Sequence, residues 1–151
     1  MAVETVIFVG LPAAGKTTFY QQRFAATHVH ISKDLWPKSA DKAARQAREL
    51  KSALSAGRSV VVDNTNPTVA DRALVIAAAR EHGARVIGYY FAAEPREAIV
   101  RNRGREGKAR VPNVAIFTTA KRLVVPDQSE GFDELYQVRV AGEGGFEVQP
   151  M

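Results

Sequence analysis

The chain has 151 residues, 46% of them hydrophobic and 25% charged, which is the size and composition of one soluble globular domain. The lack of cysteine excludes a disulfide scaffold, a thiolate metal site and a cysteine nucleophile, and no apolar stretch approaches the roughly 20 residues that a membrane span needs. The net charge of +5 has two interpretations, a surface that attracts nucleic acid or one that only keeps the protein soluble.

Strand-like and helix-like segments alternate along the chain. The N-terminal segment, residues 3–9, reads as a strand rather than a signal peptide, so we expect a cytoplasmic protein with no membrane association. Further strands are predicted over residues 28–31, 59–63, 85–91, 135–140 and 146–148, and helices over about 15–26, 41–56, 69–82, 95–103 and 111–124. This alternation predicts an α/β fold with a mostly parallel central sheet. No long linker interrupts it, so residues 1–151 are expected to form a single domain.

The loop after the first strand has the sequence of a phosphate-binding P-loop, Gly-Leu-Pro-Ala-Ala-Gly-Lys-Thr over residues 10–17. In this motif backbone N–H groups point at phosphates, Lys16 reaches the β and γ oxygens, and Thr17 can hold Mg²⁺. The alternative is a Gly-rich turn that only joins a strand to a helix, but the motif's full strand-loop-helix context is visible. We therefore predict ATP and Mg²⁺ as cofactors, bound by Gly10, Ala13, Ala14, Gly15, Lys16, Thr17 and Thr18.

Two carboxylates follow predicted strands, at the end of the strands where parallel sheets bind ligands. Asp63 ends the most hydrophobic strand and precedes Asn-Thr-Asn-Pro, so it can act on Mg²⁺ through water or orient catalytic groups. Asp34 follows the second strand and is the candidate general base, which would align an acceptor hydroxyl and take its proton. The alternative for both is capping of a turn or helix, with Lys33 and Lys38 solvated rather than holding an anionic acceptor.

Positive charge is densest between Arg96 and Arg122. Eight basic residues stand there against two glutamates, namely Arg96, Arg101, Arg103, Arg105, Lys108, Arg110, Lys121 and Arg122 against Glu97 and Glu106. Such a run is usually a solvated face. Gly104 and Gly107 favour instead a mobile lid, over about residues 101–122, in which one or two guanidiniums would clamp the γ-phosphate.

The histidines and the tryptophan add less to the predicted site. His28, His30 and His82 have no metal-ligand spacing, so we interpret them as structural. Trp36 lies close to Asp34 and is expected either to stack on an acceptor base or to be buried against the second helix.

Taken together, the chain resembles the 5′-kinase domain of the polynucleotide kinase family, most closely the kinase half of the mammalian polynucleotide kinase-phosphatase. The resemblance covers nearly the whole chain and rests on the P-loop, Ser32-Lys33-Asp34, Asp63-Asn64-Thr65-Asn66-Pro67, Arg101-Asn102-Arg103-Gly104-Arg105-Glu106, Lys121-Arg122 and Gly131-Phe132. It implies a three-layer P-loop kinase fold with a helical, Arg-rich lid, and ATP-dependent phosphorylation of the 5′-hydroxyl end of DNA or RNA. By the same resemblance Lys16 and Asp34 would be catalytic, and Arg103 or Arg105 would contact the phosphates from the lid.

The chain departs from this family in places. Lys33 stands where the family usually has arginine, and the arginine that the phage enzyme uses on the acceptor's phosphate has no clear equivalent. No Asp-x-Asp-Gly-Thr signature occurs, so 3′-phosphatase activity is not expected. Two other functions stay open, a small-molecule P-loop kinase acting on a sugar, antibiotic or nucleotide-sugar hydroxyl, and a non-catalytic ATP-gated binding protein. No oligomeric state is implied.

Overall fold

A six-stranded sheet lies at the centre of the protein, whose computed structural model describes residues 2–107 and 110–151. The strands pair in the order β2-β3-β1-β4-β5-β6, and all neighbours are parallel except β6, which runs antiparallel to β5. Their bounds are Glu4–Gly10 for β1, Val29–Ile31 for β2, Val60–Asp63 for β3, Arg85–Phe91 for β4, Glu134–Val140 for β5 and Phe146–Pro150 for β6. Lys108, which belongs to the predicted lid, lies outside the described residues.

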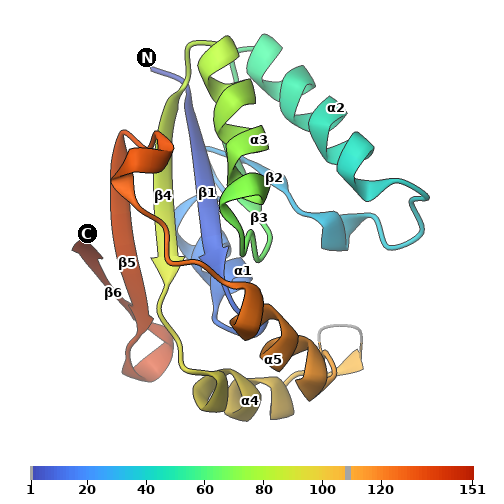
Figure 1. Ribbon diagram of the computed structural model, residues 1–151, viewed down its shortest axis with the longest axis vertical. Coiled ribbons are helices and arrows are strands. Elements are labelled where there is room, and N and C mark those ends of the chain that lie inside the picture. The colour runs from blue at the N-terminus through green and yellow to red at the C-terminus, as the bar shows by residue number, and fades with distance from the viewer. Residues whose placement is uncertain (1, 108–109) are drawn as a thin grey trace.

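Helices cover both faces of this sheet and the carboxyl end of its strands. In Figure 1, α2 and α3 lie on one face, α1 on the other, and α4 and α5 beyond the carboxyl ends of β1 and β4. The helices are α1 Lys16–Arg23, α2 Lys42–Ser55, α3 Val69–Glu81, α4 Pro95–Arg103 and α5 Asn113–Arg122. The α/β fold and the mostly parallel sheet predicted from the sequence are confirmed. Within the described part of the chain, no helix combines the length and the apolar character that a membrane span requires.

Several element ends differ from the predicted ones, and three of the differences have a local reason. α1 ends at Arg23, because Phe24 turns its ring toward Phe8 in the core. α5 begins only at Asn113, because Pro112 stands at its N-cap in an extended conformation. β6 continues to Pro150 because its backbone pairs with β5 along its whole length.

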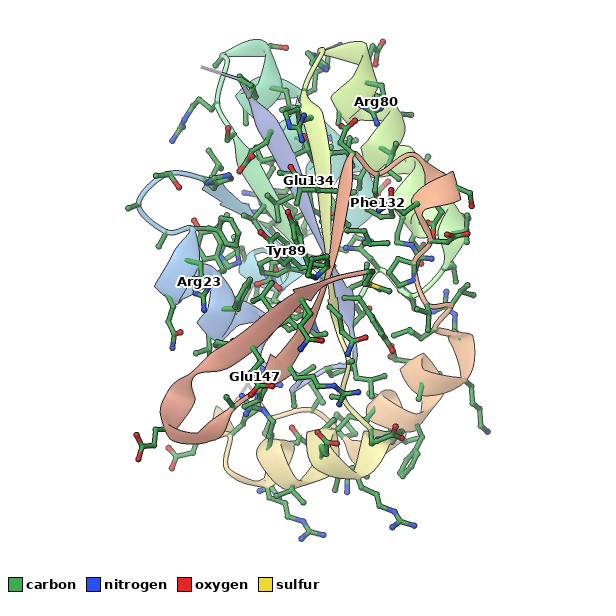
Figure 2. The ribbon with its side chains drawn as sticks, turned by 90° about the vertical axis from the view of Figure 1, so that its left-hand side faces the viewer. Arg23, Arg80, Tyr89, Phe132, Glu134 and Glu147 are labelled. Carbon is green, nitrogen blue, oxygen red and sulfur yellow. The ribbon has the colours of Figure 1, made fainter. Side chains whose placement is uncertain are left out.

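Two hydrophobic clusters, one on each face of the sheet, form the core. One packs α2 and α3 on the sheet and includes Phe132, and the other packs α1 through Phe19 against Phe8 of β1. Figure 2 views the sheet from the side and shows Phe132 and Tyr89 on opposite faces. The ring of Phe132 explains Gly88 in β4, because a Cβ there would lie 2.7 Å from it.

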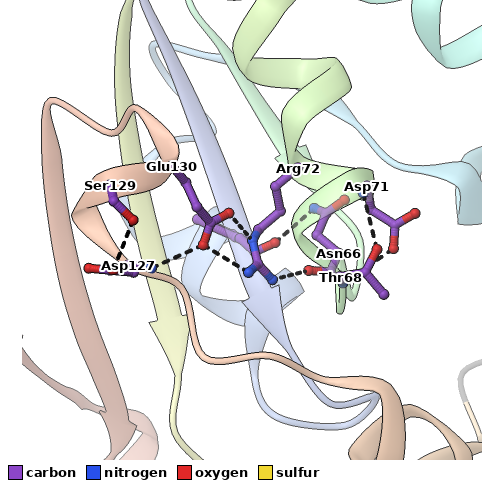
Figure 3. Close-up of polar contacts among 8 residues, drawn as sticks. Asn66, Thr68, Asp71, Arg72, Asp127, Ser129 and Glu130 are labelled. Atoms are coloured by element: carbon purple, nitrogen blue, oxygen red, sulfur yellow. Dashed lines mark hydrogen bonds and ion pairs between the residues drawn. The ribbon is translucent and has the colours of Figure 1, made fainter.

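A buried arginine joins α3 to two loops (Figure 3). Arg72 is 0% exposed and forms an ion pair with Glu130 through two hydrogen bonds of 2.8 and 2.9 Å. It donates a third hydrogen bond, of 2.9 Å, to the backbone oxygen of Asn66, while Glu130 accepts from the N–H of Asp127. The pair therefore holds the Asn-Thr-Asn-Pro loop after β3 in place from the segment that precedes β5.

Glu130→Ala is expected to lower the free energy of unfolding by about 3–5 kcal/mol, because it leaves the charge of Arg72 buried without its partner. Urea denaturation at neutral pH measures the change. Glu49→Ala is the matched control, since Glu49 forms an exposed ion pair with Arg45 at 3.8 Å and such pairs contribute at most about 1 kcal/mol. Equal losses in the two variants would show that burial adds nothing to the Arg72 pair.

Candidate active site

The loop between β1 and α1 turns through left-handed backbone conformations. Ala13 and Gly15 have φ values of 63° and 94°. Turns of this kind direct successive N–H groups toward one concave surface, which suits an anion. Gly10 does not take a positive φ, and a Cβ there would lie 2.9 Å from the Cβ of Phe91 in β4. It is needed for strand packing rather than for the turn.

The first turn of α1 opens onto this loop without a side-chain cap. Gly15 occupies the N-cap, so the first N–H groups of the helix, from Lys16 on, have no intrahelical partner. Together with the helix dipole, such N–H groups attract phosphate. The structure therefore gives the P-loop motif the geometry that phosphate binding requires.

A cavity of about 440 Å³ lies in front of the loop. Its lining comes from the P-loop and the start of α1, the β2–α2 connection, the end of β3 and the loop after it, the last turn of α4, and residues between α4 and α5: Pro12, Ala13, Gly15, Lys16, Thr17, Thr18, Asp34, Asp63, Asn64, Thr65, Arg101, Gly104, Arg105 and Val111. Most of the residues predicted for the site are thus brought together at one cavity. Gly10, Ala14 and Arg103 are the three predicted residues that do not line it.

Lys16 is buried at the floor of the cavity. Its Nζ donates to the backbone oxygens of Gly10 and Leu11, at 3.2 and 2.5 Å. The pKa of Lys16 is lowered to about 8, chiefly by burial, with the nearby charge of Arg105 also lowering it and the charges of Asp63 and Asp34 opposing the change. A phosphate anion beside Lys16 would stabilise its charged form.

Thr17 and Asp63 meet at the cavity wall. The Thr17 hydroxyl donates to Oδ2 of Asp63 at 2.9 Å, and Asp63 is only 3% exposed. The capping alternative for Asp63 is wrong, because Thr68 caps α3 in a capping box with Asp71.

The donor set at Thr17 suits a magnesium ion held together with nucleotide phosphates. Hydroxyl and carboxylate oxygens are hard ligands of the kind Mg²⁺ prefers. Among the described residues no group of three or more His, Asp or Glu side chains forms a metal site.

Asp34 is placed by hydrogen bonds around it rather than by a helix of its own. It lies in a short 3-10 turn, Lys33–Leu35, and its N–H donates to the Ser32 hydroxyl at 3.3 Å. The N–H of Lys33 donates to the side-chain oxygen of Asn64 at 2.9 Å, which fastens this turn to the end of β3. Ser32 caps the turn and Asp41 caps α2, so the capping alternative for Asp34 is also wrong.

A second cavity, of about 640 Å³, adjoins the first. The two share Asp34, Asn64 and Thr65 in their linings. The remaining wall is mostly apolar but carries two cations and one carboxylate. It consists of Lys33, Ala43, Gln46, Ala47, Leu50, Asn66, Pro67, Asp71, Leu74, Val75, Ala78 and Arg122. Asp34 therefore stands at the junction of a polar cavity by the P-loop and a larger, more apolar one beside it.

Two arginines from the predicted lid reach the first cavity. Arg101 and Arg105 line it, and Nε of Arg101 donates to the backbone oxygen of Ala13 at 3.0 Å. Arg103 is exposed in the last turn of α4 and does not line the cavity. Arg101 was missed as a site residue: it lies in the last turn of α4 whereas Arg105 follows the helix, so only the fold brings the two to one cavity.

Trp36 and His30 lie in different surroundings. Trp36 packs against the core and lies under the guanidinium of Arg45, 4.9 Å from its ring centroid, and it lines neither cavity. Of its two interpretations, the structure agrees with packing against the second helix, where Trp36 is half-buried beside Arg45. The Nε2 of His30 lies 2.8 Å from Oδ2 of Asp63.

Comparison with known proteins identifies the family. A family model described as an AAA domain matches residues 6–126. The chain belongs to the AAA domain family. Its resemblance to polynucleotide kinases is confirmed: it is 30% identical over 142 residues to a protein named as a putative bifunctional polynucleotide phosphatase/kinase of Acanthamoeba polyphaga mimivirus. That match covers 89% of this chain and 33% of the relative, so the chain spans about a third of the relative's length.

Solved structures show the same fold. A fungal RNA kinase superposes with a TM-score of 0.70 at 16% identity, over 93% of this chain and 39% of that one. A sugar kinase from Janibacter sp. HTCC2649 gives a TM-score of 0.66 at 17% identity, over 89% of this chain and 85% of that one. The fold is therefore that of P-loop kinases, and with the family it implies nucleotide binding.

Proposed function

We propose that the protein is an ATP-dependent polynucleotide 5′-hydroxyl kinase. The observation that carries the proposal is the position of Asp34, which lines both the cavity by the P-loop and the larger cavity next to it. A carboxylate at such a junction can contact an acceptor hydroxyl on one side while the γ-phosphate of ATP lies on the other. The 30% identical relative named as a polynucleotide phosphatase/kinase supports a nucleic-acid acceptor.

In this proposal the acceptor's 5′ oxygen attacks the γ-phosphorus, the bond from that phosphorus to the β–γ bridging oxygen breaks, and ADP leaves. Asp34 accepts the proton of the attacking hydroxyl. Lys16 and the loop N–H groups hold the phosphates, and Arg105 neutralises charge on the transferring group. Bound Mg²⁺, held from the protein side by Thr17 with Asp63 behind it, would neutralise the β and γ oxygens.

The larger cavity is the proposed acceptor site. Its apolar wall, which includes Leu50 and Leu74, suits the face of a nucleobase, and Lys33 and Arg122 supply positive charge for a backbone phosphate. The last turn of α4 and all of α5, within about residues 101–122 of the single proposed domain, would act as the lid. The cations of this cavity stand in for the arginine that the phage relative uses and that the sequence lacks.

Transfer of ³²P from ATP to a set of acceptors tests the proposal. We expect a 5′-hydroxyl oligonucleotide to be labelled with Mg²⁺ present, and the same oligonucleotide carrying a 5′-phosphate to remain unlabelled. A panel of sugars and aminoglycosides is run in parallel. Labelling of one of these instead of the oligonucleotide would replace the proposal with the small-molecule kinase, whose fold the Janibacter sugar kinase shares.

ATP affinity is expected to weaken above about pH 8. Below that pH Lys16 is already charged, so binding needs no proton. Above it the free protein carries a neutral Lys16, because its pKa is lowered to about 8, and binding must take up a proton. The dissociation constant should then rise by up to about tenfold per pH unit.

Calorimetry in two buffers of different ionisation enthalpy measures this uptake, which should be small at pH 7 and approach one proton at pH 9. Lys16→Arg is the control. A guanidinium stays charged over this whole pH range, so ATP binding by this variant should take up no proton. Equal proton uptake by both proteins would assign the titration to another group.

A further inference from the structure

His30 shares an oxygen of Asp63 with Thr17. Oδ2 of Asp63 lies 2.8 Å from Nε2 of His30 and 2.9 Å from the Thr17 hydroxyl that donates to it. The two contacts approach from different elements, His30 from β2 and Thr17 from the first turn of α1. One carboxylate oxygen thus links the strand edge to the P-loop helix.

The imidazole of His30 is itself held in place. Its ring stacks on that of Tyr20, with centroids 4.1 Å apart and planes 16° from parallel, and the Tyr20 hydroxyl donates to the backbone oxygen of His28 at 2.6 Å. The side chain of His30 is 18% exposed and that of Asp63 only 3%. A ring clamped this way directs Nε2–H at Asp63 and leaves it little freedom to turn.

This arrangement determines how Thr17 presents its oxygen. A hydroxyl has one proton and two lone pairs, and because the Thr17 proton goes to Asp63 the lone pairs are left for a cation. The direction of that proton depends on where Oδ2 sits. Asp63 is in a buried strand end, so a second donor on the same oxygen fixes the carboxylate against rotation.

We propose that His30 is a positioning residue, which holds Asp63 so that the Thr17 hydroxyl faces the Mg²⁺ that accompanies the nucleotide. The inference rests on the ATP–Mg²⁺ part of the proposed function and is independent of the acceptor. Outer residues that orient a metal ligand typically change metal affinity by about 10–100-fold when they are lost.

The test measures ATP binding by calorimetry, once with excess Mg²⁺ and once with EDTA. His30→Phe keeps an aromatic ring on Tyr20 and removes the donor. We expect it to weaken binding about tenfold with Mg²⁺ and by less than about twofold with EDTA. His30→Gln, whose amide restores an N–H donor, should recover most of the Mg²⁺-dependent affinity, and His30→Met serves as the donor-free variant if the phenylalanine does not fit.

His28→Phe is the matched control. His28 also pairs its Nε2 with a carboxylate, Glu4, at 2.7 Å, and is similarly shielded, but Glu4 lines neither cavity whereas Asp63, the partner of His30, lines the first. Its substitution should leave both affinities unchanged. In an Asp63→Asn background, His30→Phe should have no further effect, because the contact it removes acts through that carboxylate.

Equal weakening with and without Mg²⁺, failure of His30→Gln to rescue, or the same loss in His28→Phe would each overturn the role of His30. A wild-type protein that binds Mg²⁺–ATP but phosphorylates no oligonucleotide would contradict the proposed function alone and leave this measurement valid.

Discussion

Asp34→Asn is expected to reduce phosphate transfer by about 10²–10⁴-fold while the ATP dissociation constant stays within about twofold. The amide keeps the size of the side chain but cannot accept the proton of the attacking hydroxyl. Since the N–H of residue 34 rather than its side chain makes the contact with Ser32, the turn that carries the residue should be retained. Single-turnover labelling of a 5′-hydroxyl oligonucleotide measures the rate, and calorimetry measures ATP binding.

Asp41→Asn is the control for this substitution. Asp41 is exposed, caps α2 through its side chain and lines neither cavity, and asparagine caps a helix equally well. We expect wild-type turnover. If Asp34→Asn instead transfers phosphate at the wild-type rate, Asp34 is not the base. If the wild-type protein binds ATP and transfers nothing, the ATP-gated binding protein becomes the better description.

The fold was predictable because its signals are local. A β-branched run such as residues 59–63 favours a strand, and the alternation of such runs with amphipathic segments specifies a parallel sheet. The P-loop sequence likewise carries its own geometry, because Gly15 permits the left-handed turn that exposes the first N–H groups of α1. Even Asp34 could be found, since the carboxyl ends of parallel strands meet at one edge.

Contacts between distant residues were not predictable in the same way. The pairing of His30 with Asp63 depends on β2 lying beside β3, and nothing in the spacing of the histidines indicates it. Arg72 reads in the sequence as one more helix charge, yet it is the largest fully buried side chain. Gly10 belongs to the P-loop motif, but Phe91, which lies far away in the sequence, is what requires it.

Arg105→Gln is expected to slow phosphate transfer by about 10³-fold, the effect of removing an arginine that neutralises the transferring phosphoryl group. Arg105 lines the cavity and is close enough to Lys16 for its charge to lower the pKa of that lysine. The same substitution should therefore raise the pKa of Lys16 and move the loss of ATP affinity to higher pH. One variant thus gives two readouts, a rate and a titration, that depend on the same charge.

Arg103→Gln is the matched control for the lid. It removes an equal charge two residues away, from a side chain that is exposed and lines no part of either cavity. Its rate should stay within about twofold, because an exposed charge acts on the site only through solvent. Equal losses in both variants would mean that the lid acts through its overall charge. A loss in Arg103→Gln alone would mean that α4 turns on closing, so that the face now exposed meets the phosphates.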